Sequence, residues 1–293
     1  MACLAPVTCL GDFIHSDDAL NALPCEECPT TQGDNHMTRH PFDLSGKVAL
    51  VTGGNGGIGL GIAEGLAAAG ADIAIWGTNA AKNAAAADRL AQHGRKVHTE
   101  LCDVGDEEAV DAAMERTVAA LGRIDGCFAN AGVGSGNKGP FDQMPTEAWR
   151  RTMRVNLDGA FFTLRAAVRQ MLVQGEGGVL CSTASVAAIE GAPRSEHYAA
   201  TKGGVISMMR GLAVEYARKG IRAHSILPGW IKTEMTSVAQ GNDVFQEMVH
   251  KRVPMRRWGE GSDFAGIAVY LMSPASAYHT GDTFVIDGGY TLF

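Results

Sequence analysis

Short apolar runs alternate with longer segments of helical periodicity from Lys47 to the end of the chain. The apolar runs are unbroken rather than alternating, which is typical of parallel strands covered on both faces. The strands are expected at Lys47–Thr52, Asp72–Trp76, Val97–Cys102, Ile124–Ala129, Gly178–Cys181, Ile221–Leu227 and Thr283–Ile286. The helices are expected from the first glycine-rich turn through Ala69 and at Ala80–His93, Asp106–Leu121, Thr146–Gln174, Ser195–Lys219 and Ser262–Met272. This order predicts an α/β fold, with a doubly wound (Rossmann) seven-stranded parallel sheet in a single domain.

Two segments depart from this alternation. Residues 230–254 mix apolar and polar residues without a clear strand, and we expect a mobile flap over the site there. Residues 1–38 hold six acids and neither lysine nor arginine, so we expect a disordered leader over 1–40 before a domain at 41–293. Four of the seven cysteines lie in this leader, but Cys3 and Cys9 are not spaced like Cys25 and Cys28. Structural zinc usually needs two close ligand pairs, so no metal site is expected.

Composition narrows the class of protein. The chain has 293 residues, is 46% hydrophobic and carries a net charge of −7, which argues against nucleic acid or an anionic membrane as its main partner. No run approaches the 18 apolar residues of a membrane span, and the first residues lack the basic region of a signal peptide. Cys102, Cys127 and Cys181 fall on expected strands and are interpreted as buried thiols. A cytoplasmic protein with a small-molecule substrate is therefore expected.

The first strand runs directly into Gly53-Gly-Asn-Gly-Gly-Ile-Gly59, and a helix follows. Glycines there permit a tight turn and a close approach of backbone N–H groups to a pyrophosphate. A strand before the glycines and a helix after them predict a dinucleotide site.

Tyr198 and Lys202 lie four residues apart on an expected helix, so they share one face. A nearby ammonium favours the phenolate, and we expect it to lower the pKa of Tyr198 towards neutrality. Ser185 follows the fifth strand, at the edge of the sheet where α/β proteins bind ligands. Together the three predict proton exchange with an alcohol or a carbonyl. Ser182 and Thr183 are interpreted as turn residues.

Over residues 43–293 these motifs resemble the short-chain dehydrogenase/reductase family. The resemblance implies a catalytic tetrad of Asn156, Ser185, Tyr198 and Lys202. Tyr198 would transfer the proton, Lys202 would lower its pKa and hold the nicotinamide ribose, Ser185 would bind the reacting oxygen, and Asn156 would anchor a water. The cofactor contacts implied are Gly53, Asn55, Gly57, Ile58, Gly59, Thr78, Asp103, Val104, Asn130, Ala131, Gly132, Tyr198, Lys202, Pro228, Gly229, Ile231 and Thr233. Ala129 and His224 depart from the family's usual asparagines without removing a catalytic group.

The leading hypothesis is an oxidoreductase that transfers hydride between NAD(P) and a secondary alcohol or ketone. The glycine spacing also fits the longer branch that includes sugar-nucleotide epimerases and dehydratases, but few residues follow the last strand, which favours the short branch. A regulator that only binds the cofactor is a second alternative, and the intact tetrad argues against it. The expected walls of the substrate pocket, at 133–141, 186–197 and the flap, select no single substrate class.

The end of the second strand bears on the choice of cofactor. Gly77 and Thr78 supply neither an acid for the ribose hydroxyls nor an arginine for a 2′-phosphate, and Lys82 is the nearest cation. The sequence therefore favours NAD slightly over NADP. By resemblance the native form is a homotetramer, and Phe161, Phe162, Met208 and Met209 supply apolar surface for it.

Overall fold

Seven parallel strands form one sheet in the order β3-β2-β1-β4-β5-β6-β7. They are β1 (Val48–Thr52), β2 (Asp72–Gly77), β3 (Val97–Leu101), β4 (Gly126–Ala129), β5 (Gly178–Thr183), β6 (Ile221–Pro228) and β7 (Thr283–Ile286). The computed structural model describes residues 40–136 and 139–292, and His40–Phe293 form one compact unit. The expectations of a disordered leader and of no zinc site at its cysteines concern residues outside the described ones.

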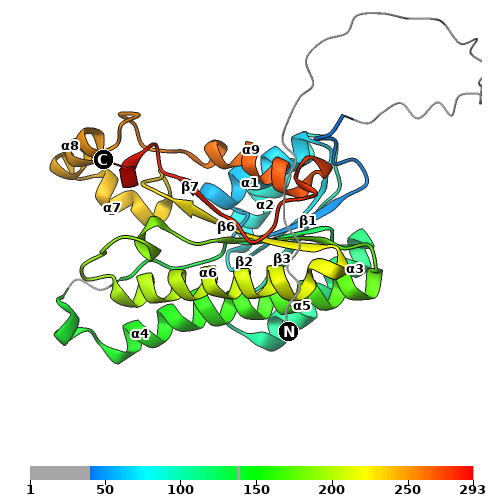
Figure 1. Cartoon of the computed structure of the whole chain (residues 1–293), viewed down its shortest axis with the longest axis horizontal. Helices are drawn as coiled ribbons and strands as arrows, with labels where there is room; N and C mark the ends of the chain where they lie inside the picture. Colours follow the sequence, from blue (N-terminus) through cyan, green and yellow to red (C-terminus); the bar gives the residue numbers. More distant parts are fainter. Residues whose placement is uncertain (1–39, 137–138, 293) are drawn as a thin grey trace, which may run out of the picture. The chain divides into compact units, whose positions relative to one another are not determined.

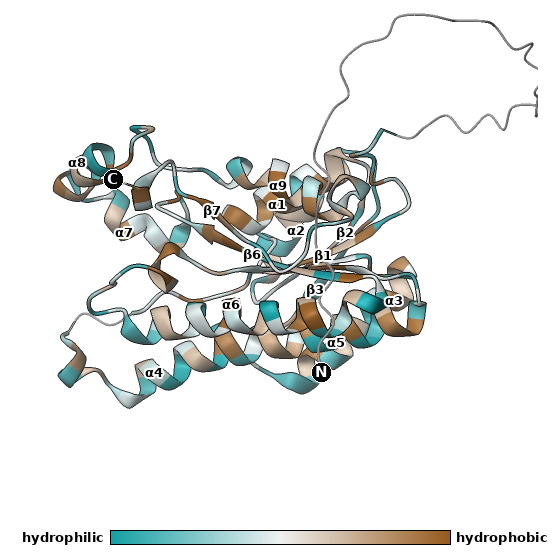
Figure 2. Ribbon diagram, in the orientation of Figure 1, coloured by the Kyte–Doolittle hydropathy of each residue, from teal (hydrophilic) through white to brown (hydrophobic). Residues whose placement is uncertain are grey.

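Helices cover both faces of this sheet (Figure 1). One layer contains α1 (Gly57–Ala68), α2 (Ala80–Ala91) and α9 (Ala265–Met272), and the other contains α3 (Glu107–Leu121), α5 (Gly159–Gln174) and α6 (Glu196–Tyr216). The strands between the layers are largely hydrophobic, whereas the helices also carry many hydrophilic residues (Figure 2). The doubly wound α/β fold predicted from the apolar runs is therefore confirmed.

The two faces of β1 show why its sequence is apolar at every position. Val48 and Leu50 pack in the core beneath α3, α5 and α6, whereas Ala49 and Val51 pack in the core beneath α1 and α9. All four side chains are buried, since successive residues of a strand point to opposite faces of the sheet. A strand covered on one side only would show polar residues at every second position.

The helix expected over Thr146–Gln174 is interrupted. The chain forms α4 (Thr146–Met153), then a π-helical turn at Arg154–Asp158, and then α5. A π turn inserts one extra residue into an otherwise α-helical path, and such turns occur frequently at functional sites. Here the turn contains Asn156, whose side chain bonds both the amide and the carbonyl of Val133. Hydrophobic periodicity does not reveal a single inserted residue, so the sequence predicted one continuous helix.

The segment expected to be a flap contains two helices, α7 (Ser237–Gln240) and α8 (Asp243–Arg252). A cluster of aromatic side chains holds them against the chain that follows. Trp230 contacts Phe245, Trp258 and Tyr290 with ring centroids 4.8, 5.9 and 6.4 Å apart. Within the described residues, no helix is both long enough and apolar enough to span a bilayer.

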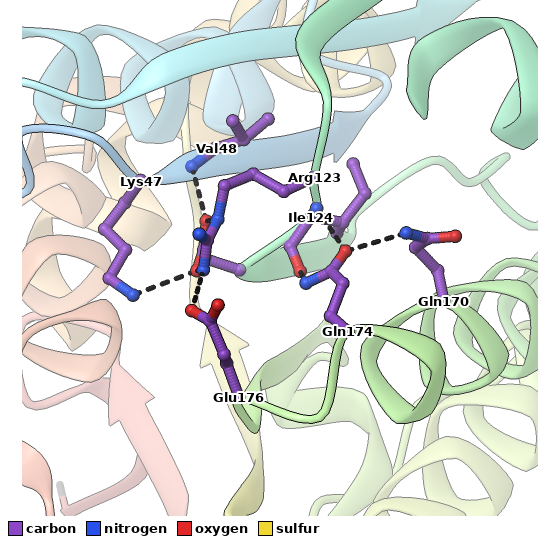
Figure 3. Close-up of polar contacts among 8 residues, drawn as sticks. Lys47, Val48, Arg123, Ile124, Gln170, Gln174 and Glu176 are labelled. Carbon is purple, nitrogen blue, oxygen red and sulfur yellow. Dashed lines mark hydrogen bonds and ion pairs between the residues drawn. The ribbon is translucent and has the colours of Figure 1, made fainter. Parts of the chain in front are cut away.

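At the amino ends of the strands, Asp125 joins three segments of the chain. Figure 3 shows its partners Lys47, Val48 and Arg123 close together. Its buried carboxylate accepts hydrogen bonds from the Val48 amide at 2.9 Å, from Lys47 Nζ at 3.0 Å and from two nitrogens of Arg123. Arg123 also bonds Glu176, which precedes β5. Burial by itself would raise the pKa of Asp125, but these hydrogen bonds outweigh it and hold the pKa below its ordinary value.

Replacing Asp125 by asparagine should lower the free energy of unfolding at pH 7 by roughly 3 kcal/mol, because Arg123 and Lys47 lose their charged acceptor. A carboxylate with a lowered folded pKa stabilises fully above its unfolded pKa of about 3.9, and this stabilisation is lost as the pH falls through the folded pKa. The difference between wild type and Asp125→Asn should therefore shrink from pH 7 to pH 3. Urea unfolding at both pH values measures it.

The matched control is Asp111→Asn, which removes one carboxylate from the exposed pair with Arg169. It should change stability by less than about 1 kcal/mol. Equal losses in the two variants would contradict the assignment of Asp125 as the residue that joins these strands.

Candidate active site

A cavity of about 480 Å³ lies at the carboxyl edge of the sheet. It is bordered by the residues that follow β1, β4, β5 and β6, where the chain order reverses between β1 and β4. Open α/β sheets bind ligands in this kind of crevice. The lining residues are Gly53, Asn55, Gly56, Gly57, Ile58, Lys82, Asn130, Ala131, Gly132, Thr183, Ala184, Ser185, Tyr198, Lys202, Pro228, Gly229, Ile231, Thr233, Glu234, Met235 and Thr236.

The glycine-rich turn leaves room for an anion at the start of α1. Gly57 has φ +51°, and a Cβ there would lie 2.9 Å from Thr233 Cγ2. Gly56, the residue before the helix, supplies no side-chain cap, and a Cβ there would meet nothing within 4 Å. The first amides of a helix carry partial positive charge and lack partners within the helix. The turn therefore fits the pyrophosphate of a dinucleotide.

Asn130 holds the ends of three strands together beneath the cavity. Its backbone N–H donates to Thr52 Oγ1 at 3.1 Å, and its side-chain amide donates to the Thr52 carbonyl at 3.0 Å. Its Oδ1 accepts from Thr183 Oγ1 at 3.1 Å. Thr52 ends β1, Asn130 follows β4 and Thr183 ends β5, so this network sets the shape of the cavity floor.

The four residues of the expected tetrad come from three different segments. Ser185 follows β5, Tyr198 and Lys202 lie on the first two turns of α6, and Asn156 lies in the π turn. Ser185 hydrogen-bonds the phenol oxygen of Tyr198. The Lys202 ammonium donates to the Thr183 carbonyl at 2.7 Å and lies 5.5 Å from the centre of the Tyr198 ring.

Asn156 supports this group without lining the cavity. It is 2% exposed, and its amide bonds the Val133 amide at 2.8 Å and the Val133 carbonyl at 2.9 Å. Its Oδ1 would lie 3.2 Å from a Cβ placed on Gly132, which does line the cavity. Asn156 thus fixes the loop that follows β4.

The pKa expected for Tyr198 needs correction. Burial raises the pKa of this phenol above its ordinary value, and the hydrogen bond from Ser185 only partly offsets the increase. The expected lowering of the Tyr198 pKa by Lys202 is not found. Burial lowers the pKa of Lys202 itself to about 8. Both groups are therefore shifted towards their neutral forms. The spacing predicted that the two groups share one face of the helix. It could not show that both are buried, and burial disfavours their charged forms.

Four expected cofactor contacts do not line the cavity: Gly59, Thr78, Asp103 and Val104. Gly59 instead packs against the carbonyl of Gly53, which a Cβ would overlap. The Asp103 carboxylate bonds the Gly105 amide and Arg154, each at 3.0 Å. Thr78 is exposed and Val104 is buried. Roles of these four in cofactor binding stay predictions.

Gly77, the position that would hold an acid for the ribose, is filled from both sides. A Cβ there would overlap Asn55 Nδ2 and lie 2.6 Å from Asn83 Oδ1, and these two side chains hydrogen-bond each other at 2.7 Å. Asn83 also donates to the carbonyls of Gly77 and Glu100. An asparagine pair therefore occupies the space that an acid would need.

Sequence reasoning missed two features of the site. The Thr183 carbonyl binds Lys202, yet Ser182 and Thr183 were interpreted as turn residues. Both belong to β5, and Ser182 is fully buried, with its hydroxyl 3.1 Å from that of Ser225. The type of a residue does not show whether its backbone carbonyl will accept a hydrogen bond from a distant side chain. The second feature is an ion pair between Lys82 and Glu234, which are 152 residues apart.

Two further positions lie away from the cavity. His224 is fully buried, and burial lowers its pKa to about 4. Ala129 ends β4 within the core. Among residues 40–136 and 139–292 there is no group of three or more histidine, cysteine or acidic side chains arranged to hold a metal ion.

Comparisons with known proteins agree with this geometry. Residues 53–291 match the family model described as enoyl-(acyl carrier protein) reductase. The chain is 37% identical to gluconate 5-dehydrogenase of Gluconobacter oxydans over 261 residues, which are 86% of this chain and 98% of that protein. A crystal structure of a short-chain type dehydrogenase/reductase from Mycobacterium marinum is similar with a TM-score of 0.81, 36% identity and coverage of 85% and 97% of the two chains.

A gluconate 5-dehydrogenase from Burkholderia cenocepacia, crystallised with NADP and tartrate, is similar with a TM-score of 0.81 and 36% identity, covering 87% of this chain and all of that one. Both the sequence and the whole fold are therefore shared with oxidoreductases of one family. The chain belongs to the short-chain dehydrogenase/reductase family and is an NAD(P)-dependent oxidoreductase that acts on CH–OH groups.

Proposed function

We propose that the substrate is a sugar acid, and that the enzyme interconverts one of its secondary alcohols with the corresponding ketone. The similarity to gluconate 5-dehydrogenases in both sequence and structure supports this class. The observation that carries the reaction type is the placement of Ser185, Tyr198 and Lys202 together in the cavity behind the glycine-rich turn.

The residues divide the work of a hydride transfer. A bound nicotinamide would supply or accept the hydride. The phenol of Tyr198 supplies the proton to the new alkoxide, or accepts it in the reverse direction. Ser185 donates a hydrogen bond where negative charge develops on the substrate oxygen. Because burial keeps the phenol protonated, the ligand-free site is prepared to act as the acid in ketone reduction.

Lys202 and Asn156 support Tyr198 and Ser185 and do not act on the substrate directly. The ammonium of Lys202 is held by the Thr183 carbonyl. It stabilises the phenolate that forms when Tyr198 gives up its proton, and it would hold the ribose hydroxyls of a bound cofactor. Asn156 fixes the loop at Val133. Its role in anchoring a water that returns the proton to Tyr198 stays a prediction. We infer contacts with the cofactor from the residues around the turn and from Thr233, whose methyl group packs at Gly57.

The two alternatives from the sequence fit less well. An epimerase or dehydratase requires a pocket for a sugar nucleotide, whereas the similar proteins named above are dehydrogenases or reductases. A regulator without catalysis does not need a tyrosine and a lysine together in the cavity. Both cofactors are proposed to bind, and the slight preference for NAD stays a prediction, since the Burkholderia structure contains NADP.

The proposed assembly is a homotetramer in the cytoplasm. Phe161 on α5 is 42% exposed and Phe162 is partly buried, so both can contribute to a contact between subunits. Met209, expected to contribute, is 1% exposed and belongs to the core. Three buried free thiols, at Cys102, Cys127 and Cys181, are compatible with a reducing compartment.

Substrate and reaction type are tested by following the absorbance of NADH and NADPH with 5-keto-D-gluconate, a cyclic ketone and a short enoyl thioester. The keto acid should be reduced with the highest kcat/KM, because a sugar acid is the proposed substrate class. Tyr198→Phe should lower kcat with that substrate by at least about 100-fold while leaving NADH binding nearly unchanged, since only the proton donor is lost.

Ser182→Ala serves as a control, because this hydroxyl is buried beside Ser225 and does not line the cavity. It should keep kcat within a few-fold of wild type. Full activity in Tyr198→Phe would contradict the mechanism, and exclusive activity on the enoyl thioester would contradict the substrate class.

Lys202→Met should make the ligand-free protein more stable at pH 7 while reducing turnover. A buried lysine with a folded pKa of about 8 is charged at pH 7 at a cost in free energy of order 3 kcal/mol, reduced in net effect by the lost bond to Thr183. In wild type the folded state loses the Lys202 proton as the pH rises above about 8, so this destabilisation disappears towards the unfolded pKa of about 10.5. The advantage of the variant in stability should therefore shrink over that range.

Urea unfolding of both proteins at pH 7 and pH 10 measures this difference. A variant that is less stable than wild type at pH 7, or equally different at both pH values, would show that the charge on Lys202 is not costly.

Assembly is tested by light scattering at micromolar concentration. Wild type should have the mass of four chains, and Phe161→Glu should favour smaller species, because it places a charge at an apolar contact. A monomeric wild type would disprove the tetramer.

A further inference from the structure

An ion pair crosses the rim of the cavity between two distant segments. Lys82 lies in the first turn of α2, and Glu234 begins a short 3-10 helix at Glu234–Thr236. The ammonium and the carboxylate are in direct contact, and both residues line the cavity. The segment that follows β6 is thereby joined by charge to the helix that follows β2.

The backbones of both residues are held in place, whereas the side chains remain in contact with solvent. The amide of Lys82 is capped by the Asn79 side chain at 3.0 Å. The turn at Glu234 is fixed by Thr236 Oγ1, which accepts from the Thr233 amide at 3.1 Å, and by Gln240, which donates to the Thr233 carbonyl at 2.9 Å. The side chains of Lys82 and Glu234 are 47% and 82% exposed. A ligand that offers a better partner can therefore separate them without unfolding either turn.

The position of the pair relates it to one part of the cofactor. In this class of fold the adenosine ribose lies at the carboxyl end of the second strand. That strand ends at Gly77, and α2 follows it directly. Among the described residues that line the cavity, the cationic side chains are Lys82 and Lys202, and Lys202 is committed to the Thr183 carbonyl beside Tyr198. Lys82 is thus the lining cation on the ribose side of the glycine-rich turn.

We propose that Glu234 is a specificity-determining residue that acts against NADP by occupying Lys82. A 2′-phosphate carries between one and two negative charges at neutral pH and needs a cation, whereas a free 2′-hydroxyl does not. The 2′-phosphate of NADP must displace the Glu234 carboxylate from Lys82 and must then lie close to that carboxylate. NAD, which lacks the phosphate, leaves the ion pair intact. This inference rests on the proposed binding of both cofactors in the cavity.

The size of the effect is limited by solvent. Exposed ion pairs are weak and are screened by salt, so the carboxylate is a competitor rather than a barrier. We expect Glu234→Gln to tighten NADPH binding about fivefold and to change NADH binding less than twofold. Lys82→Met should weaken NADPH binding by a similar factor and leave NADH binding unchanged. Both effects should diminish when the salt concentration rises from 20 to about 500 mM.

The test is direct titration of NADH and NADPH into the full chain, followed by cofactor fluorescence, for wild type, both single variants and the double variant. If Glu234 acts by occupying Lys82, most of the gain in NADPH affinity from Glu234→Gln disappears in the Lys82→Met background. The matched control is Glu247→Gln, which removes the same charge from the exposed pair with Lys251 on α8. This control should leave the ratio of the two affinities unchanged.

Two results would overturn the inference: a ratio of affinities unmoved by Glu234→Gln, or a full gain that persists without Lys82. An unmoved ratio in which both affinities change equally would assign Glu234 only a role in the fold of its segment. A wild type that binds neither cofactor would contradict the proposed function itself, whereas binding of both with an unmoved ratio would contradict only the role of Glu234.

Discussion

The buried ammonium of Lys202 is the interaction on which the arrangement of the active site depends. A charge that is only 5% exposed requires a strong acceptor, and the Thr183 carbonyl at the end of β5 supplies it. That carbonyl is in place because the Thr183 side chain bonds Asn130, which in turn bonds Thr52 at the end of β1. Lys202 is thus supported by three strand ends rather than by its own helix alone.

The burial of Lys202 and Tyr198 also affects how these two groups ionise before any ligand binds. Burial shifts Tyr198 and Lys202 towards their neutral forms, and at pH 7 the cost in stability falls on Lys202, which stays charged there while the phenol is neutral in any case. The same removal of water strengthens the interaction between them once charge develops on a substrate oxygen. The cost of keeping these groups out of water is consistent with a site adapted to the reaction rather than to the ligand-free state.

The amino and carboxyl edges of the sheet differ in how their charged and polar groups are paired. At the amino edge, Asp125 bonds Lys47, Arg123 and the Val48 amide, a set of satisfied charges that ties strands together. At the carboxyl edge, the glycine-rich turn leaves helix amides uncapped, and Lys82 and Glu234 meet across the rim. The turn without a side-chain cap and the exposed ion pair therefore lie at the carboxyl edge, whereas the buried carboxylate of Asp125 and its partners lie at the amino edge.

The sequence by itself determined the order of elements, the parallel sheet and the shared helix face of Tyr198 and Lys202. Those properties are local: apolar runs mark strands, glycines mark the turn, and a spacing of four places Tyr198 and Lys202 on one face. The tertiary structure alone decided the π turn at Asn156, the buried placement of Ser182, the filling of the space at Gly77 and the contact of Lys82 with Glu234. It also decided the direction of the Tyr198 pKa. Each of these depends on which distant atoms come together and how much water they exclude, and residue types along the chain do not encode either quantity locally.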